Sequence, residues 1–251
     1  SEPEDMRANL ERLAAQPNPL LIGGGDGTIR ETGAYLAQHK KAFGILPFGT
    51  MNLLAMDLGL TSLDGALAAY AAGHRETLID AGYVNDELFL CCASIGTMPE
   101  ASVYREEIRK KHRWLLIPKM FWFVLTSLEK HKGERVVLEI DCKMRRFRTP
   151  AVVISANRFR DSEKLTARHY LRPAEDDGRL AAYIATTWSR ISHLRLMSRL
   201  MIGHWLQDPD LTEITARKIV LWSKHKDELI SIDGEVTELD TPLHFTLKPK
   251  S

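Results

Sequence analysis

The sequence predicts an α/β lobe in residues 1–78 followed by a β-rich lobe in residues 79–251. In the first lobe, short apolar runs alternate with stretches of helical spacing, an order typical of a parallel βαβ unit with a right-handed crossover. In the second lobe, short apolar runs separated by turn residues dominate, which favours a β-sandwich or a barrel. We expect the two lobes to abut around a cleft, which is a common place for a ligand site.

The elements of the first lobe follow from hydrophobic spacing and from the turn residues between them. Proline and glycine mark several ends, because proline cannot continue a helix and glycine favours turns. The spacing predicts helices over residues 4–15, 29–38, 51–59 and 63–72, and strands over residues 19–22 and 42–46.

The second lobe combines short apolar runs with two longer helical stretches. The helical stretches, residues 99–132 and 189–205, interrupt the strands as insertions. The apolar runs predict strands over residues 78–84, 87–94, 136–142, 146–155, 180–186, 218–222, 228–232 and 243–247.

Charge and cysteine content argue against several classes of protein. The formal net charge is +1, so no overall field attracts the chain to nucleic acid. The three cysteines show no Cys-x-x-Cys spacing, which argues against a zinc site and a disulfide framework. We find no secretory signal and no apolar stretch long enough to cross a bilayer. These features predict a cytoplasmic protein that does not bind nucleic acid.

A glycine-rich turn, Gly23-Gly-Gly-Asp-Gly-Thr28, joins the first predicted strand to a predicted helix. Successive glycines let backbone N–H groups approach a phosphate without hindrance from a Cβ atom. The helix N-terminus adds unpaired donors and a partial positive charge, so the turn predicts an anion site. Asp26 is suited to holding a metal-bound water, a ribose or a neighbouring backbone. The alternative is an ordinary tight turn in which Asp26 is the N-cap.

A second turn of similar design, Leu46-Pro-Phe-Gly-Thr-Met-Asn52, ends the next predicted strand. Gly49 allows a close backbone approach, while Thr50 and Asn52 offer side-chain hydrogen bonds. The alternative is a turn that only caps the helix after it.

The two turns resemble the Gly-Gly-Asp-Gly-Thr and Leu-Pro-x-Gly-Thr-x-Asn-Asp signatures of the diacylglycerol kinase catalytic family, which includes bacterial diacylglycerol and sphingosine-type lipid kinases. NAD kinases share the first signature, whereas the second signature favours the diacylglycerol kinase catalytic family over NAD kinases. The resemblance implies a Rossmann-like, phosphofructokinase-like first lobe that lacks its first strand here, a β-sandwich second lobe and a cleft between them. It also implies ATP-dependent transfer of the γ-phosphate to a lipid hydroxyl. Leu53 stands where the family usually has a second acidic residue.

The resemblance further implies which residues bind ATP and Mg²⁺. Residues 173–180 resemble the family's Asp-Asp-Gly-x-Leu segment, which holds a structural Mg²⁺ in bacterial lipid kinases; a solvated hairpin turn is the alternative. The implied nucleotide-binding residues are Gly23, Gly24, Gly25, Asp26, Gly27, Thr28, Glu31, Gly49, Thr50 and Asn52. The implied Mg²⁺ ligands are the Asp177 carboxylate and the backbone oxygens of Ala174 and Arg179.

A late segment, Asp233-Gly-Glu235, follows an apolar strand and resembles the segment in which the family places its catalytic base. Asp233 and Glu235 are both candidates for accepting the proton of the lipid hydroxyl, and Asp26 is a third candidate catalytic residue. A strong base is not needed, because phosphoryl transfer relies mainly on positioning and charge stabilisation. A β-turn without a catalytic role is the alternative.

A lipid substrate must be met at a membrane surface, so we expect peripheral association with the inner face of the membrane. In residues 105–128, basic residues precede aromatic ones, which suits an anionic interface; a helical hairpin packed on the β-rich lobe is the alternative. Residues 190–199 have a similar pattern. An NAD kinase and a non-catalytic nucleotide-binding or lipid-binding regulator remain open alternatives, and so does a homodimer.

Overall fold

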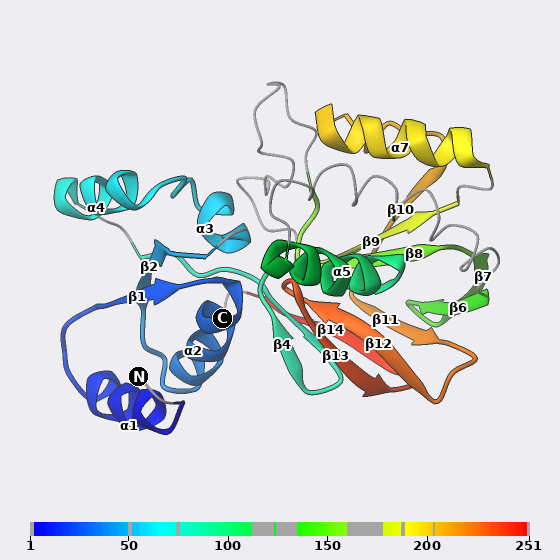
Figure 1. Cartoon of the computed structure of the whole chain (residues 1–251). Helices are drawn as coiled ribbons and strands as arrows, with labels where there is room; N and C mark the ends of the chain where they lie inside the picture. The colour runs from blue at the N-terminus through cyan, green and yellow to red at the C-terminus, as the bar shows by residue number, and fades with distance from the viewer. Residues whose placement is uncertain are drawn as a thin grey trace. The chain divides into compact units, whose positions relative to one another are not determined.

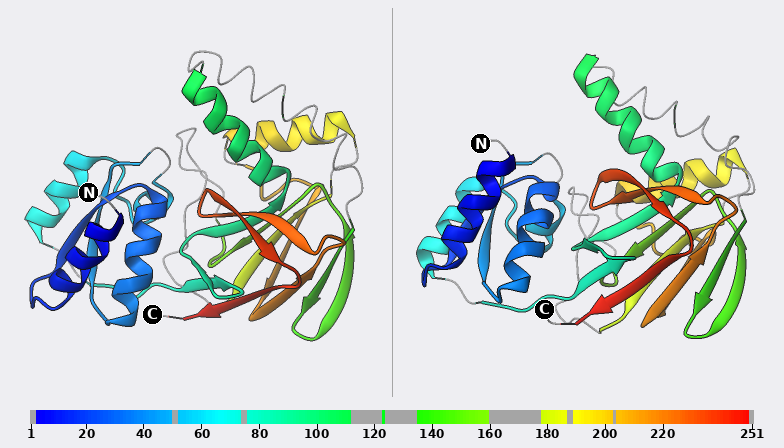
Figure 2. Two further views of the ribbon diagram at one scale, coloured as in Figure 1. Left: turned by 60° about the horizontal axis from the view of Figure 1, so that its bottom comes forward. Right: turned by 90° about the horizontal axis from the view of Figure 1, so that it is seen from below.

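The chain divides into two compact units, one formed by residues 1–79 and the other by residues 80–250 (Figures 1 and 2). The predicted boundary between residues 78 and 79 lies one residue before this division. The first unit is α/β and the second is a β-sandwich, so the predicted fold class is confirmed. The computed structural model describes residues 3–49, 52–73, 76–111, 123, 135–159, 178–186, 189–202 and 204–249.

The first unit is built on a parallel pair of strands, β1 (Leu20–Gly24) and β2 (Phe43–Pro47). Helix α2 (Asp26–Gln38) connects them and packs on both, with Ile29 and Leu36 buried (Figure 1). The predicted βαβ unit is therefore confirmed. The helix begins three residues earlier than predicted, directly after the glycine-rich turn.

Three further helices belong to the first unit: α1 (Pro3–Ala14), α3 (Leu53–Asp57) and α4 (Leu63–Ala72). Helix α4 covers the free edge of β2 through one side chain. The Tyr70 hydroxyl accepts a hydrogen bond from the Ile45 N–H at 2.7 Å and donates one to the Ile45 oxygen at 3.2 Å. These bonds satisfy backbone groups that a strand edge would otherwise leave to solvent.

The second unit is a sandwich of two six-stranded antiparallel sheets, with orders β10-β9-β8-β5-β12-β13 and β4-β3-β14-β11-β6-β7 (Figure 2). The strands are β3 (Ala81–Val84), β4 (Glu87–Phe89), β5 (Cys92–Gly96), β6 (Arg135–Ile140), β7 (Lys143–Arg148), β8 (Ala151–Ser155), β9 (Leu180–Ala185), β10 (Leu211–Ala216), β11 (Lys218–Trp222), β12 (Asp227–Ile232), β13 (Glu235–Asp240) and β14 (Leu243–Lys248). Alternation along each strand sends every second side chain into the space between the sheets.

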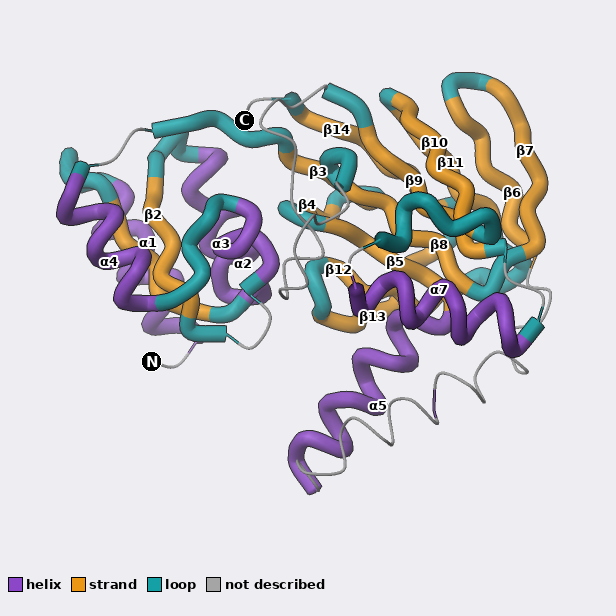
Figure 3. Tube along the Cα trace, turned by 90° about the horizontal axis from the view of Figure 1, so that it is seen from above, coloured by secondary structure: helices purple, strands orange, loops and turns teal. Residues whose placement is uncertain are grey.

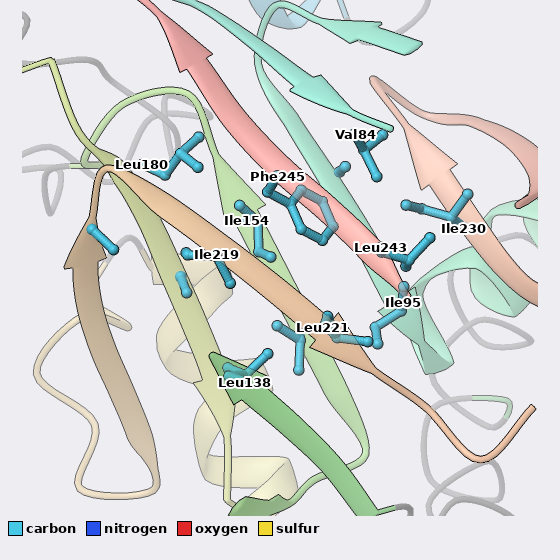
Figure 4. Close-up of a cluster of buried hydrophobic side chains, with 14 of the residues drawn as sticks. Val84, Ile95, Leu138, Ile154, Leu180, Ile219, Leu221, Ile230, Leu243 and Phe245 are labelled. Carbon is cyan, nitrogen blue, oxygen red and sulfur yellow. The ribbon is translucent and has the colours of Figure 1, made fainter. Parts of the chain in front are cut away.

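The main hydrophobic core fills that space between the two sheets. Ile154 and Ile230 come from one sheet, and Leu138, Leu243 and Phe245 come from the other. All five side chains are at most 1% exposed, and Figure 4 shows them gathered in one cluster. Burial of large apolar side chains on this scale is the dominant stabilising contribution to the second unit.

Helix α7 (Arg190–Ile202) lies over the outer face of the sheet at β9, whereas helix α5 (Thr97–Lys111) follows β5, contacts β5, β12 and β13, and then runs outward from the sheet (Figure 3). A second cluster under α7 includes Tyr183 from β9 and Trp205. Strand β9 is consequently buried on both faces. No helix in the described ranges is both long and apolar enough to cross a membrane.

Two of the predicted strands are wrong, because each is two strands that belong to different sheets. The predicted strand 87–94 divides into β4 and β5, and the predicted strand 146–155 divides into β7 and β8. In the second case Pro150, which has no N–H to donate to a ladder, lies at the break. In the first case the backbone N–H groups at the break, those of Leu90 to Cys92, donate hydrogen bonds to the Asp233 carboxylate instead of continuing one strand.

Strands β10 and β13 were not predicted from the sequence. Each lies at an edge of the sheet, and polar residues occupy three of six positions in β10 and four of six in β13, so the hydrophobic signal of both is weak. The predicted helix 99–132 corresponds to α5 in its first part, and its remainder lies almost entirely outside the described residues.

We predict that His193 of α7 makes the second unit less stable in mild acid. Burial lowers the pKa of His193 from 6.5 to about 4. Between these pH values, His193 is protonated in the unfolded chain but stays neutral in the folded chain. The free energy of unfolding therefore falls as the pH decreases below about 6.5, and it levels off below about 4. After allowance for solvent screening, we expect a loss of about 2 kcal/mol.

Urea denaturation of the wild type and His193→Gln at pH 7 and pH 4.5 tests this prediction. The difference between the two proteins should shrink at the lower pH, because only the wild type loses the histidine contribution. His204→Gln, at an exposed position, serves as the control and should follow the wild type. Parallel pH dependences of the wild type and His193→Gln would contradict the prediction.

Candidate functional site

The two glycine turns lie side by side at one end of the parallel pair β1 and β2. Gly24 is in register with Pro47, and the Phe48 N–H donates a hydrogen bond to the Gly24 oxygen at 3.1 Å. The carboxyl ends of parallel strands meet at the same edge of a sheet, which is where ligands bind in open α/β folds. The turns predicted separately therefore form one candidate site in the first unit.

The contact between the turns is backbone against backbone. A Cβ atom added to Gly49 would lie 2.5 Å from the Gly25 Cα, and one added to Gly25 would lie 3.3 Å from the Gly49 Cα. Real Cβ atoms essentially never approach a neighbour closer than 3.0 Å. Position 49 therefore requires glycine for the close approach itself.

The family resemblance implies that these turns bind a nucleotide, and on that expectation Gly49→Ala should push the two turns apart and weaken ADP binding at least tenfold. The clash is with backbone, which cannot rotate away as a side chain can, and overpacking of this kind costs about 1–3 kcal/mol. Isothermal titration with ADP and thermal unfolding measure the two effects. Gly65→Ala on α4 is the matched control and should leave ADP affinity unchanged. Wild-type affinity in Gly49→Ala would contradict the role assigned to the contact.

Asn52 fixes the second turn with its side-chain amide. Its Oδ1 accepts a hydrogen bond from the Gly49 N–H at 2.7 Å, and its Nδ2 donates one to the Gly49 oxygen at 2.9 Å. Asn52 has φ 50° and ψ 46°, a left-handed conformation that asparagine tolerates better than most residues. Asn52 thus holds Gly49 in place, whereas Thr50 lies outside the described residues.

Asp26 binds the backbone at the start of α3. Its Oδ1 accepts a hydrogen bond from the Leu53 N–H at 2.6 Å. Burial raises the pKa of Asp26, and the backbone N–H groups of Leu53, Leu54 and Asn52 act in the opposite direction. Of the three partners expected for Asp26, the structure provides the neighbouring backbone. The carboxylate joins the first turn to the second, and it does so without help from the side chain of residue 53.

The N-terminus of α2 lies within the first glycine turn and has no side-chain cap, because its N-cap residue is Gly25. The first N–H groups of an α-helix, here those from Asp26 to Thr28, have no partner within the helix and carry a partial positive charge. This arrangement can hold a phosphate. Gly23 and Gly24 end β1 beside it, Gly27 and Thr28 lie in the first turn of α2, and Glu31 is exposed further along the helix.

In the second unit, Asp233 lies in a tight hairpin turn between β12 and β13. Asp233 and Gly234 both have positive φ, 49° and 89°, and Ile232 pairs with Glu235 across the turn. Two positive φ values in a two-residue hairpin loop define a type I′ turn, for which Asp-Gly is a favoured sequence. The expected β-turn is therefore present, whichever role its acids have.

The Asp233 carboxylate points back into the protein and accepts three backbone hydrogen bonds. Oδ2 accepts from the Leu90 N–H at 2.7 Å, and Oδ1 accepts from the Cys91 and Cys92 N–H groups at 2.9 and 3.0 Å. The residue is 4% exposed. These bonds turn the chain between β4 and β5, which is why one predicted strand became two. Three of the roughly four lone-pair positions of the carboxylate therefore accept from backbone donors.

Glu235 is the exposed acid of the pair. It is the first residue of β13, an edge strand, and its side chain is accessible to solvent. The structure thereby separates two residues that the sequence could not distinguish: Asp233 shapes the turn, and Glu235 is presented at its surface.

The predicted Mg²⁺ loop lies mostly outside the described residues. Asp177 and Ala174 fall outside them, and Arg179 directly precedes β9. The Arg179 side chain points to Asp141, with Nη2 3.5 Å from Oδ2. Within the described ranges, no group of three or more His, Cys, Asp or Glu side chains is arranged to hold a metal ion. Mg²⁺ binding through this loop stays a prediction.

Sequence reasoning missed the backbone donors that bind the two aspartates, the N–H groups of Leu53 and of Leu90 to Cys92. Their side chains are apolar or weakly polar, and backbone donors carry no residue-type signal. The only hint was the pair of Asp-Gly dipeptides, since aspartate in turns commonly accepts hydrogen bonds from nearby backbone.

Two family descriptions match the chain. Residues 1–84 match "Diacylglycerol kinase catalytic domain" and residues 101–251 match "YegS C-terminal NAD kinase beta sandwich-like domain". Together they cover both units and include both glycine turns and the Asp233–Glu235 hairpin.

Individual relatives agree with these descriptions. A Pseudomonas aeruginosa protein named "Probable lipid kinase YegS-like" is 38% identical over 103 residues, 40% of this chain and 34% of that protein. The matched region thus spans about a third of its length. A Staphylococcus epidermidis diacylglycerol kinase is 26% identical over 239 residues, 92% of this chain and 72% of that protein. A Bacillus anthracis structure described as a diacylglycerol kinase shares the fold, with TM-score 0.68, 18% identity, and coverage of 100% of this chain and 80% of that one.

Proposed function

This chain belongs to the family that joins a diacylglycerol kinase catalytic domain to a YegS-type β-sandwich domain, and on that premise we propose that it is an ATP-dependent lipid kinase. It transfers the γ-phosphate of ATP to the hydroxyl of a membrane lipid such as diacylglycerol or a sphingoid base. The protein works in the cytoplasm and meets its substrate at the inner face of the membrane.

The observation that carries the proposal is the backbone contact between Gly25 and Gly49 beside the uncapped N-terminus of α2. Two turns held this closely bring backbone N–H groups together and exclude side chains from the space above them. Asn52 binds the Gly49 N–H within the second turn, and Asp26 of the first turn binds the Leu53 N–H that follows it. A di- or triphosphate is the ligand that such an array of donors suits best.

Glu235 is the acid we assign as catalytic base, because it is exposed while the Asp233 carboxylate is occupied by backbone donors. Glu235 accepts the proton of the lipid hydroxyl, and the hydroxyl oxygen forms a bond to the γ-phosphorus of ATP. The bond from that phosphorus to the β–γ bridging oxygen breaks, and ADP leaves with the electron pair. A carboxylate of ordinary basicity is sufficient for such a transfer.

Mg²⁺ bound with the nucleotide would neutralise phosphate charge during this transfer. A structural Mg²⁺ is assigned to the Asp177 carboxylate and the backbone oxygens of Ala174 and Arg179.

Incubation of the full-length protein with γ-labelled ATP, Mg²⁺ and separate acceptors tests the proposal. The acceptors are mixed micelles of diacylglycerol, mixed micelles of a sphingoid base, and NAD. Label in a lipid is the expected result. Label in NAD would identify an NAD kinase instead, and bound ATP without transfer to any acceptor would favour a regulator.

Asp26→Ala should lower the rate of transfer at least tenfold, because α3 loses the carboxylate that binds its first N–H group. Asp26→Asn keeps an oxygen that can accept this bond and should retain more activity than the alanine variant. Initial rates at saturating ATP measure the difference. Activity of Asp26→Ala close to that of the wild type would remove Asp26 from the site.

A further inference from the structure

Phe48 is a large apolar side chain that stays exposed in the middle of the nucleotide-binding turns. Its exposed fraction is 61%, although it follows directly on β2 and precedes Gly49. Isolated exposed hydrophobic residues are common on protein surfaces, so exposure alone assigns no role. The position of the ring and the way it is held are what distinguish Phe48.

The ring is held against the glycine-rich turn by its own backbone and by Gly23. The Phe48 N–H is bonded to the Gly24 oxygen at 3.1 Å, which fixes the backbone from which the side chain projects. A Cβ atom added to Gly23 would lie 2.6 Å from Cε2 and 2.7 Å from Cδ2 of the ring. The ring therefore lies against the Gly23 backbone, where any other residue would displace it, and the rest of its surface is open.

The distance along β1 between the Phe48 ring at Gly23 and the N-terminus of α2 suits the nucleoside part of a nucleotide. Gly23 lies two residues before Gly25, the N-cap of α2, which corresponds to about 7 Å of strand. Phosphates bound at the helix N-terminus would leave the rest of the nucleotide to extend over the neighbouring surface. The open side of the Phe48 ring lies on this surface, because Phe48 directly follows β2 and its N–H is bonded to the Gly24 oxygen.

We propose that Phe48 forms the base subsite of the nucleotide site, by stacking its open surface on the purine ring of ATP or ADP. The inference rests on the proposed function, because the phosphates must be held at the glycine turns for the base to reach the ring. Stacking on an aromatic face needs no hydrogen bonds to the base. It supplies affinity for the nucleoside part that the phosphate-binding turns cannot supply.

Isothermal titration of the full-length protein with ADP and with pyrophosphate, both with Mg²⁺, separates the base from the phosphates. Phe48→Ala should weaken ADP binding about 5- to 100-fold and leave pyrophosphate binding within twofold of the wild type. Phe48→Trp should keep ADP affinity, and its added tryptophan emission should be quenched by ADP and not by pyrophosphate. Leu21→Ala, a 50%-exposed position of β1, is the control and should change neither affinity.

Equal weakening of ADP and pyrophosphate in Phe48→Ala would overturn the inference, because it would mean that the turn itself was deformed. Unchanged ADP affinity in that variant would also overturn it, and a raised KM for the lipid would then assign Phe48 to the acceptor. A wild-type protein that binds neither ligand would overturn the proposed function together with this inference. Binding of pyrophosphate by the wild type with no gain from the nucleoside would overturn the inference alone.

Discussion

Replacing Asp233 with alanine should lower the free energy of unfolding of the second unit by about 3–5 kcal/mol. Three backbone N–H groups, those of Leu90, Cys91 and Cys92, would lose their acceptor inside the protein. Each hydrogen bond to a charged group contributes about 1.5–3 kcal/mol, and an unsatisfied buried donor adds its own desolvation cost. The bend between β4 and β5 would lose the group that defines it.

Thermal unfolding measures this loss, which corresponds to a decrease of about 6–20 °C in the melting temperature of a domain of this size. Asp233→Asn should fall between the wild type and the alanine variant. Its remaining carbonyl oxygen can accept from Cys91 and Cys92, but its amide nitrogen would face the Leu90 N–H. A stable Asp233→Ala protein that has lost phosphotransfer would contradict the structural role and return Asp233 to the chemistry.

The sequence predicted the elements whose hydrophobic pattern is strong and local. The βαβ unit around α2 and strands such as β11, whose bounds were predicted without error, belong to this group. In one of the failed predictions, a contact from far along the chain decided the outcome. The run from residue 87 to 94 is continuous in hydrophobicity, and it is broken by Asp233, more than 140 residues later. Local periodicity contains no information about such a contact.

In the candidate site, too, the sequence indicates which residue types are present but not which distant residues contact each other. Gly25 and Gly49 could be predicted as phosphate-binding positions because glycine is the residue type that a close backbone approach demands. The sequence could not show that the two glycines touch each other, or that Asp26 binds the Leu53 N–H. It was also unable to choose between Asp233 and Glu235, since both follow the same strand.

Leu53 illustrates why a departure from a signature can be tolerated. The position is usually acidic in the family that the sequence resembles, and leucine removes that charge. In the structure, however, residue 53 binds Asp26 through its backbone N–H, which every residue except proline provides. The link between the two turns therefore survives the substitution.

Replacing Glu235 with glutamine should reduce phosphotransfer about 100- to 10,000-fold without destabilising the second unit. Glutamine has nearly the same shape but cannot accept the hydroxyl proton, and loss of a general base typically costs this much. Glu235 is exposed at the start of edge strand β13, so the substitution creates no cavity and buries no charge. Its melting temperature should stay within about 2 °C of the wild type, because exposed substitutions rarely exceed 0.5 kcal/mol.

The matched control is Glu238→Gln, which removes an equal charge from an exposed position of the same strand. It should keep phosphotransfer within about twofold, because a change in surface potential alone has only a small effect on a transfer step at physiological salt. ADP affinity should be unchanged in both variants, since the proposed phosphate site belongs to the first unit. If both variants lose activity equally, charge around β13 and not a base at position 235 supports the reaction. If Glu235→Gln keeps more than a tenth of wild-type activity, the proton is accepted elsewhere.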